Sequence, residues 1–137
     1  MNFREKVEYL STYQSIVAKI AGNLKEYERW LVIGSKCTQM IQQDEGHGSG
    51  GEKRIENAAI MMAEISKAID AETQKAIRDR DEIERCISDK SKYRRYAELL
   101  EMRFIKGMSN YEIANSINKN VRTVRKVMRK AIDTLEI

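Results

Sequence analysis

Apolar side chains recur every seven residues along the first part of the chain. A second set of positions, formed by Tyr13, Ile20, Tyr27 and Gly34, lies three residues after four members of this repeat. Such a repeat places one apolar seam along a helix and favours packing against another helix. The pattern predicts a helix over residues 3–41. Its seam is formed by Phe3, Leu10, Val17, Leu24 and Leu31.

A second seven-residue repeat predicts a helix over residues 53–88. Residues 43–52 hold four glycines in ten positions, which predicts a turn. Two helices joined by a short loop pack as an antiparallel hairpin, so residue i should face about residue 94 − i. The second seam is formed by Ile55, Met62, Ile69, Ala76 and Ile83, and it is widened by Ala58, Ala59, Ile65 and Ile87.

The width of this stripe bears on partners. More than two apolar positions per heptad favour additional packing partners. We therefore expect the coiled-coil-like hairpin to form a homodimer, because two-fold dimers are the commonest oligomers. The alternatives are that the hairpin docks on another protein or packs on the chain's own C-terminal domain. The register places Cys37 and Cys86 at opposite ends, so we expect no disulfide between them.

The last part of the chain predicts three further helices, over residues 92–106, 110–117 and 121–135. Gly107 can end the first, because glycine adopts the left-handed cap conformation without a steric penalty. Ser109 and Glu112 form a capping box for the second helix. Residues 118–120 make a turn that ends at Asn120, the expected N-cap of the third.

These three helices have the spacing of a helix-turn-helix. Ala114 falls where the second and third helices touch, and Ile117 and Val124 are placed to pack beneath the turn. The third helix should bury Val124, Val127 or Met128, Ala131 and Leu135. The expected fold is all-α, with a helical hairpin over residues 1–90 and a helix-turn-helix domain over residues 91–137.

Charge separates the two parts. Residues 1–90 hold 14 Lys and Arg against 16 Asp and Glu, a net charge of −2, whereas residues 91–137 hold 11 against 5, a net charge of +6. Between Glu112 and Asp133 there is no acidic residue to pair with the cations. A helix that carries unpaired like charges favours a polyanionic partner. The predicted helix over 121–135 would be the second helix of the helix-turn-helix, and a basic helix in that place suits the major groove of double-stranded DNA.

The residue types suggest how the contacts divide. Arg122 and Lys126 are the expected base readers, because Arg and Lys pair with guanine O6 and N7. Thr123 could contact a thymine methyl group or a phosphate. The remaining cations should hold phosphates and set the register. They are Lys119, Arg125, Arg129 and Lys130, with Arg94 and Arg95 on the first helix.

Residues 93–136 resemble the fourth conserved region of bacterial sigma factors. The likeness lies in the leucine-rich helix that leads into Gly107-Met108-Ser109-Asn110-Tyr111-Glu112-Ile113-Ala114, in residues 120–127, and in the Ala131-to-Leu135 ending. The whole layout is similar to small phage and prophage sigma-like regulators, including the autolysin-regulator (ArpU-like) group. The resemblance implies a transcriptional regulator whose Arg122, Thr123, Arg125 and Lys126 reach DNA, with RNA polymerase as a further candidate partner.

The sequence departs from that family at Val121, Arg122 and Lys126, where arginine, glutamate and glutamine are usual. These changes argue against recognition of a standard −35 element, and the chain has no −10-binding region that could melt a promoter. Two rival functions stay open: a phage small terminase subunit, and an adaptor that binds RNA polymerase through the hairpin.

Other classes of protein are disfavoured. The chain shows no paired catalytic carboxylates and no nucleophile next to a base, so we expect neither an enzyme nor a cofactor or metal site. The single histidine, His47, lies among glycines and is expected to be solvated. No run of eighteen apolar residues could span a membrane and the charged N-terminus is unlike a signal peptide, so we expect a cytoplasmic protein.

Overall fold

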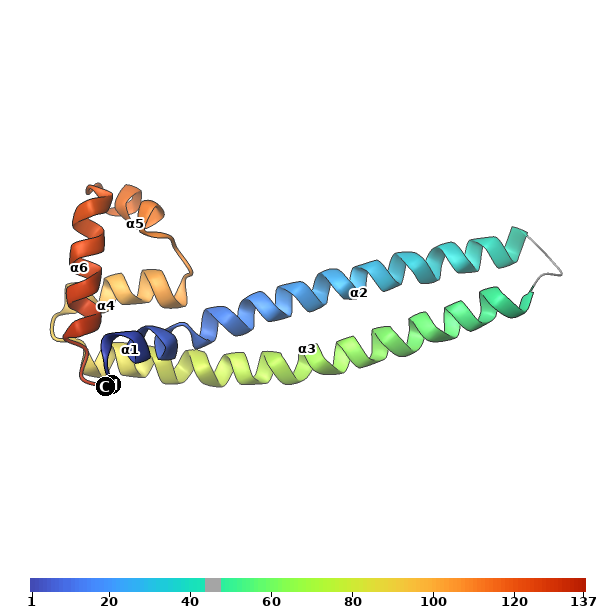
Figure 1. Cartoon of the computed structure of the whole chain (residues 1–137), viewed down its shortest axis with the longest axis horizontal. Coiled ribbons are helices and arrows are strands. Elements are labelled where there is room, and N and C mark those ends of the chain that lie inside the picture. Colours follow the sequence, from blue (N-terminus) through green and yellow to red (C-terminus); the bar gives the residue numbers. More distant parts are fainter. Residues whose placement is uncertain (44–47) are drawn as a thin grey trace. The chain divides into compact units, whose positions relative to one another are not determined.

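The protein is all-helical. The computed structural model describes residues 1–43 and 48–137, and the side chains outside residues 40–50. The order of the helices can be followed in Figure 1. They are α1 (Phe3–Leu10), α2 (Thr12–Gln43), α3 (Gly48–Lys90), α4 (Arg94–Leu100), the π-helix η1 (Glu101–Ile105), α5 (Asn110–Ile117) and α6 (Val121–Asp133).

Two helix boundaries differ from the prediction. The predicted helix over 3–41 is interrupted at Ser11, so a short α1 precedes α2. The predicted turn over 43–52 is also shorter than expected, because α3 already begins at Gly48. Glycine lowers helix propensity by only about 1 kcal/mol, which a long helix with an apolar stripe can offset. The prediction for His47 lies outside the described residues.

The chain forms two compact units. The first comprises residues 1–16 and 75–137, and the second comprises residues 17–74. This division differs from the predicted boundary at residue 90. The physical reason is that Leu10, Ile83 and Ile87 share one hydrophobic cluster with the C-terminal helices. The first and third quarters of the chain therefore contribute to the same core as the last.

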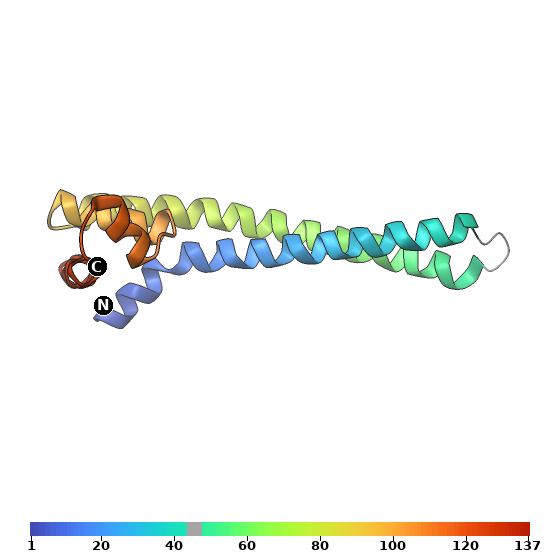
Figure 2. The same ribbon diagram turned by 90° about the horizontal axis from the view of Figure 1, so that it is seen from above.

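Within the second unit, α2 and α3 are antiparallel neighbours, and Figures 1 and 2 show them side by side from two directions. Asn23 Nδ2 donates to Glu72 Oε2 over 2.8 Å, and Lys19 Nζ lies 3.5 Å from Glu72 Oε1. A Cβ atom at Gly34 would lie 3.6 Å from the Cβ of Ala58. Each contact joins residues within about one helical turn of the predicted register.

The seam of α2 differs from the one predicted. Val17, Leu24 and Leu31 are exposed, whereas positions one residue earlier or three residues later are buried or half-buried. The side of α2 that is less exposed is formed by Ile20, Asn23, Tyr27, Trp30, Gly34 and Cys37. The seam of α3 agrees better with the prediction, since Ala58 and Ile65 are buried and Ile55, Met62 and Ile69 are half-buried.

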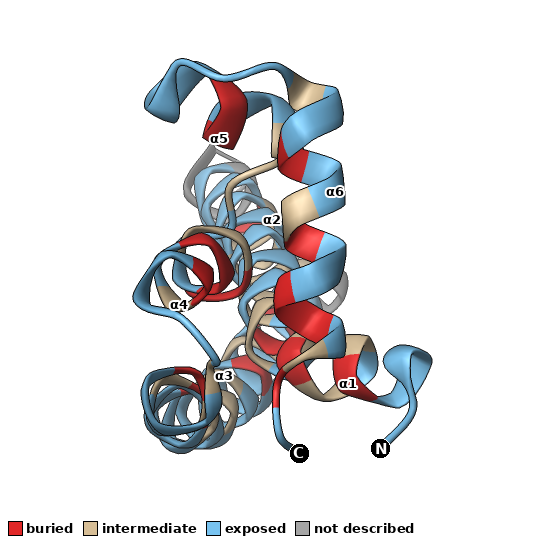
Figure 3. Ribbon diagram, turned by 90° about the vertical axis from the view of Figure 1, so that its left-hand side faces the viewer, coloured by how far each residue is buried: buried red, intermediate tan, exposed pale blue. Residues whose placement is uncertain are grey.

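The core of the first unit depends on one face of α6. Figure 3 shows buried residues along one side of α6 and exposed residues along the other. Met128, rather than Val127, completes the buried face, and Ile132 joins it. Ala114 is buried as predicted, but Ile117 is exposed, so its predicted packing beneath the turn was wrong. The buried side of α6 consists of Val124, Met128, Ala131 and Ile132, and Leu135 follows the helix.

The predicted helix over 92–106 is two elements. It begins at Arg94, and over Glu101–Ile105 it widens into a π-helix, where Lys106 N–H donates to Glu101 O over 3.0 Å. Gln14 Nε2 donates to Ile105 O over 2.8 Å and so provides a partner for a carbonyl at this end. Gly107 follows with φ of +70°, as the predicted glycine stop requires.

Helix α1 is held against this unit by polar as well as apolar contacts. The buried Lys6 donates from Nζ to Asp133 O over 2.9 Å, which places a cation at the C-terminal end of α6 where the helix dipole favours it. Burial, and then the neighbouring Glu82 carboxylate, raise the pKa of Tyr9 to about 12. The Tyr9 hydroxyl therefore stays protonated and donates to Glu82 Oε1 over 3.3 Å.

Gly107→Ala should destabilise the protein. A side chain at this positive φ costs about 1–2 kcal/mol, and the new Cβ would lie 2.9 Å from Gln14 Oε1. Gly22→Ala is the matched control, because nothing lies within 4 Å of a Cβ at Gly22 inside α2, and alanine there should stabilise by up to about 1 kcal/mol. Urea denaturation followed by circular dichroism measures both; equal effects of the two variants would contradict the prediction.

Candidate nucleic-acid interface

Capping residues fix both ends of α5 and the start of α6. Ser109 Oγ accepts from Glu112 N–H over 3.2 Å, and Asn120 Oδ1 accepts from Arg122 N–H over 2.9 Å, so both predicted N-caps are confirmed. Asn118 ends α5 in the left-handed conformation, with φ of 55°. Asparagine tolerates that conformation better than most residues, which lets α6 leave at a sharp angle to α5.

The cations of α6 are exposed and without carboxylate partners. Every Lys and Arg from Lys119 to Lys130 is exposed. Six ion pairs are found among the side chains described, and none includes a cation from residues 119–130. Like charges one turn apart on a helix repel by a few tenths of a kcal/mol per pair. This strip is therefore electrostatically unsatisfied within the part of the chain that the structure describes.

The cations are ordered around α6. With about 3.6 residues per turn, Arg122 and Lys126 lie opposite Val124 and Ala131, which are buried in the same helix. Thr123 and Lys130 lie on one flank of this central pair, and Arg125 and Arg129 lie on the other. The predicted base readers thus occupy the most protruding line of the helix, with cations on both sides.

One flank borders an open hollow of about 390 Å³. Arg95, Lys119, Thr123 and Lys130 lie around it, so the structure brings together four of the predicted contact residues from three parts of the chain. Its remaining lining is mostly apolar and includes the exposed Ile117, together with one carboxylate, Glu98, which pairs with Arg94. Arg95 is held beside this hollow by aromatic rings, with its guanidinium carbon 5.3 Å from the ring centroids of both Tyr93 and Tyr96.

On the other flank, two arginines lie against aromatic rings. The sequence alone did not link these rings to the predicted DNA contacts. Arg125 Nη2 donates to Tyr111 Oη over 3.4 Å, and its guanidinium carbon lies 5.5 Å from that ring's centroid. The guanidinium carbon of Arg129 lies 5.3 Å from the ring centroid of Phe3. Tyr111 could have been recognised as an exposed aromatic residue in the first turn of α5. Phe3 carries no such signal, because its partner is far away in sequence.

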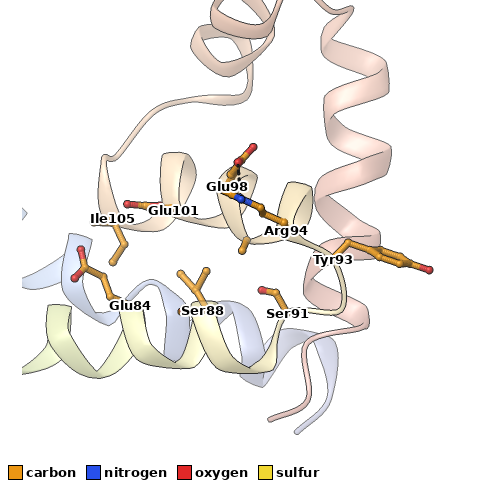
Figure 4. A pocket seen from close by; sticks show the side chains of 10 residues that line it. Glu84, Ser88, Ser91, Tyr93, Arg94, Glu98, Glu101 and Ile105 are labelled. Atoms are coloured by element: carbon orange, nitrogen blue, oxygen red, sulfur yellow. Dashed lines mark ion pairs between the residues drawn. The ribbon is translucent and has the colours of Figure 1, made fainter.

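Arg94 is set apart from the other predicted contacts. It lines a different hollow, of about 670 Å³, between the end of α3 and the helices α4 and η1. Figure 4 shows Arg94 paired there with Glu98, and Arg94 Nε lies 3.5 Å from Glu98 Oε1. Glu84 and Glu101 line the same hollow, so its charge is unsuited to phosphate. The structure therefore joins Arg95, but not Arg94, to the surface formed with α6.

Most of this chain matches a known protein family. Residues 38–136 match the family described as a protein of unknown function, DUF1492. The chain belongs to the DUF1492 family. The match covers α3, α4, η1, α5 and α6, so the basic surface of α6 lies inside the family region. No curated protein and no solved structure matches the chain.

Residues 1–43 and 48–137 contain neither a cluster of metal-ligating side chains nor a helix that could span a membrane. No group of three or more His, Cys, Asp or Glu side chains is placed to hold a metal ion. None of the helices described there combines the length and the apolar character needed to cross a membrane.

Asn120→Ala should loosen the start of α6. The variant removes the acceptor for Arg122 N–H, and loss of an N-cap costs about 1 kcal/mol. Asn115→Ala is the control, because Asn115 is exposed inside α5 and alanine favours helix. Thermal unfolding should give a lower midpoint for Asn120→Ala and an unchanged or higher one for Asn115→Ala; the reverse order would refute this role of Asn120.

Proposed function

We propose that this member of the DUF1492 family is a sequence-specific transcriptional regulator that binds double-stranded DNA by placing α6 in the major groove. The observation that carries the proposal is the row of exposed cations on α6, which no described carboxylate pairs with. Phosphate oxygens would provide the missing counterions, and their binding would relieve the repulsion along the helix.

The shape of the surface also suits a duplex. A helix in the major groove faces bases along its centre and a phosphate strand on either side. Arg122 and Lys126 lie along the centre line of α6, where a helix reaches base edges. Lys119, Lys130 and Arg95 lie on one flank and Arg125 and Arg129 on the other, which is the distribution that two phosphate strands require.

The contacts of α1 with α6 leave the charge of the exposed cations unchanged. Phe3 lies against Arg129 but adds no charge, and Lys6 is occupied by Asp133 O. Neither contact neutralises the cations. Tyr111 lies beside Arg125, so we assign Tyr111 the task of holding this guanidinium for a phosphate. The connection of α5 to α6 serves as the turn of a helix-turn-helix, with α6 as its reading helix.

The kind of regulator follows from the sequence resemblance. Residues 93–136 resemble region 4 of bacterial sigma factors, so we propose a sigma-like regulator that is encoded by a phage or prophage. Because the chain departs from that family at Val121, Arg122 and Lys126, its DNA site should differ from a standard −35 element. Selection of bound sequences from a random duplex pool would define the site.

Arg122→Ala and Lys130→Ala should weaken DNA binding in different ways. Arg122→Ala should cost about 1–3 kcal/mol and relax the preference at one base pair, because a base contact is lost. Lys130→Ala should weaken all sequences similarly and lower the salt slope by about 1, because a phosphate contact is lost. Fluorescence anisotropy with the selected duplex, its point variants and a random duplex separates these effects.

The control is Lys36→Ala, which removes an exposed cation from α2 and should leave affinity and salt slope unchanged. A uniform loss for Arg122→Ala would remove it as a base reader. Absence of any salt-dependent duplex binding by the parent protein would sink the proposal and favour an RNA-polymerase adaptor. Ring-shaped assemblies seen by mass photometry would instead favour a small terminase subunit.

A further inference from the structure

Helix α2 exposes a regular row of apolar side chains within the second unit. Val17, Leu24 and Leu31 are 37, 47 and 49 % exposed and lie seven residues apart. Leu24 and Leu31 each follow directly after a residue of the side that faces α3, namely Asn23 and Trp30. One residue turns a helix by about 100°, so the row runs along one side of the contact between the two helices.

The same side of α3 carries small, uncharged side chains. Ala59 and Ser66 follow directly after the buried Ala58 and Ile65, and all three of Ala59, Ala63 and Ser66 are exposed. Because the two helices are antiparallel and both are right-handed, the residues that follow the contact positions lie on the same side of the pair. This face of the second unit therefore presents leucines on α2 and a shallow strip on α3.

Charged residues at the edge of this face are also arranged in a regular way. Lys25 and Glu28 lie on α2, and Lys67 and Asp70 lie on α3. All four are exposed, and none takes part in an ion pair among the side chains described. The α2–α3 register places Lys25 and Asp70, and likewise Glu28 and Lys67, within about one helical turn of each other.

We propose that this face binds the same face of a second copy of the chain, with a two-fold axis that lays α2 of each copy along α3 of the other. Leu24 and Leu31 then pack on the strip of Ala59, Ala63 and Ser66. At the edges, Lys25 meets Asp70 and Glu28 meets Lys67 of opposite copies. Each contact occurs twice, as in any isologous interface.

A second copy fits this face because the face is complementary to itself. It carries both the large and the small apolar side chains, and both signs of charge within about one helical turn of each other. The helix pair also needs more burial than it provides alone: among the described side chains of the second unit, only Cys37, Ala58 and Ile65 are buried. Four helices around a shared core supply that burial. The inference does not depend on DNA binding.

The first test replaces the leucines. Leu24→Glu with Leu31→Glu should convert the protein from twice to once the 15.9 kDa chain mass in light scattering at micromolar concentration, with helicity unchanged. The control is Ala68→Glu with Ala71→Glu, which changes exposed residues on the opposite side of α3 and should leave the dimer intact. A monomeric parent protein, a dimeric leucine variant or a monomeric control would each overturn the proposal.

A charge exchange tests the arrangement without changing the apolar face. Lys25→Glu with Lys67→Glu places like charges at all four edge contacts and should raise the dimer dissociation constant at least tenfold at low salt. Adding Glu28→Lys and Asp70→Lys in the same chain restores opposite charges and should restore the dimer. Failure of this rescue in sedimentation equilibrium would overturn the proposed pairing of α2 with α3, even if the leucine variant proved poorly folded.

Discussion

Burial of one side of α6 in the hydrophobic cluster sets the orientation of this helix and of its exposed cations. Val124, Met128, Ile132 and Leu135 are almost fully buried, and full burial of such side chains contributes about 1.5–3 kcal/mol each. Because a helix is rigid, fixing these residues also fixes the direction of every cation between them. The strip of like charges is thus held outward by apolar packing, which outweighs its own repulsion.

The remaining elements brace this arrangement. Gln14 binds the carbonyl of Ile105 where the π-helix ends, and its side chain also borders the position that a Cβ of Gly107 would occupy. Lys6 binds the last turn of α6. Residues from the first helix turns of the chain therefore complete the first unit, and removal of that segment would take Leu10 out of the cluster that it shares with Ile83 and Ile87.

The contact between the two helices of the second unit depends less on apolar burial than the core around α6 does. Their mutual contact includes Asn23, Glu72 and Gly34, which allow close or polar approach but bury little apolar surface. The leucines, which would bury much more, lie to one side. These exposed leucines are free to pack on another surface, and their seven-residue spacing is the part of the heptad repeat that the contact between α2 and α3 does not use.

The residues that cap the C-terminal helices could be recognised from their local neighbours in the chain. Ser109, Asn120 and Gly107 act locally, and their effects depend on neighbours within a few residues, so the bounds of α5 and the start of α6 could be predicted. The helical spacing of apolar residues likewise predicted Val124, Ala131 and Leu135 as part of the buried face. Three features depend on long-range packing: the seam of α2 that meets α3, the break between α1 and α2, and the binding partners of Phe3, Lys6 and Gln14. The contacts of these last three residues join positions about ninety or more apart. Periodicity along a helix gives the direction of a side chain without naming its partner.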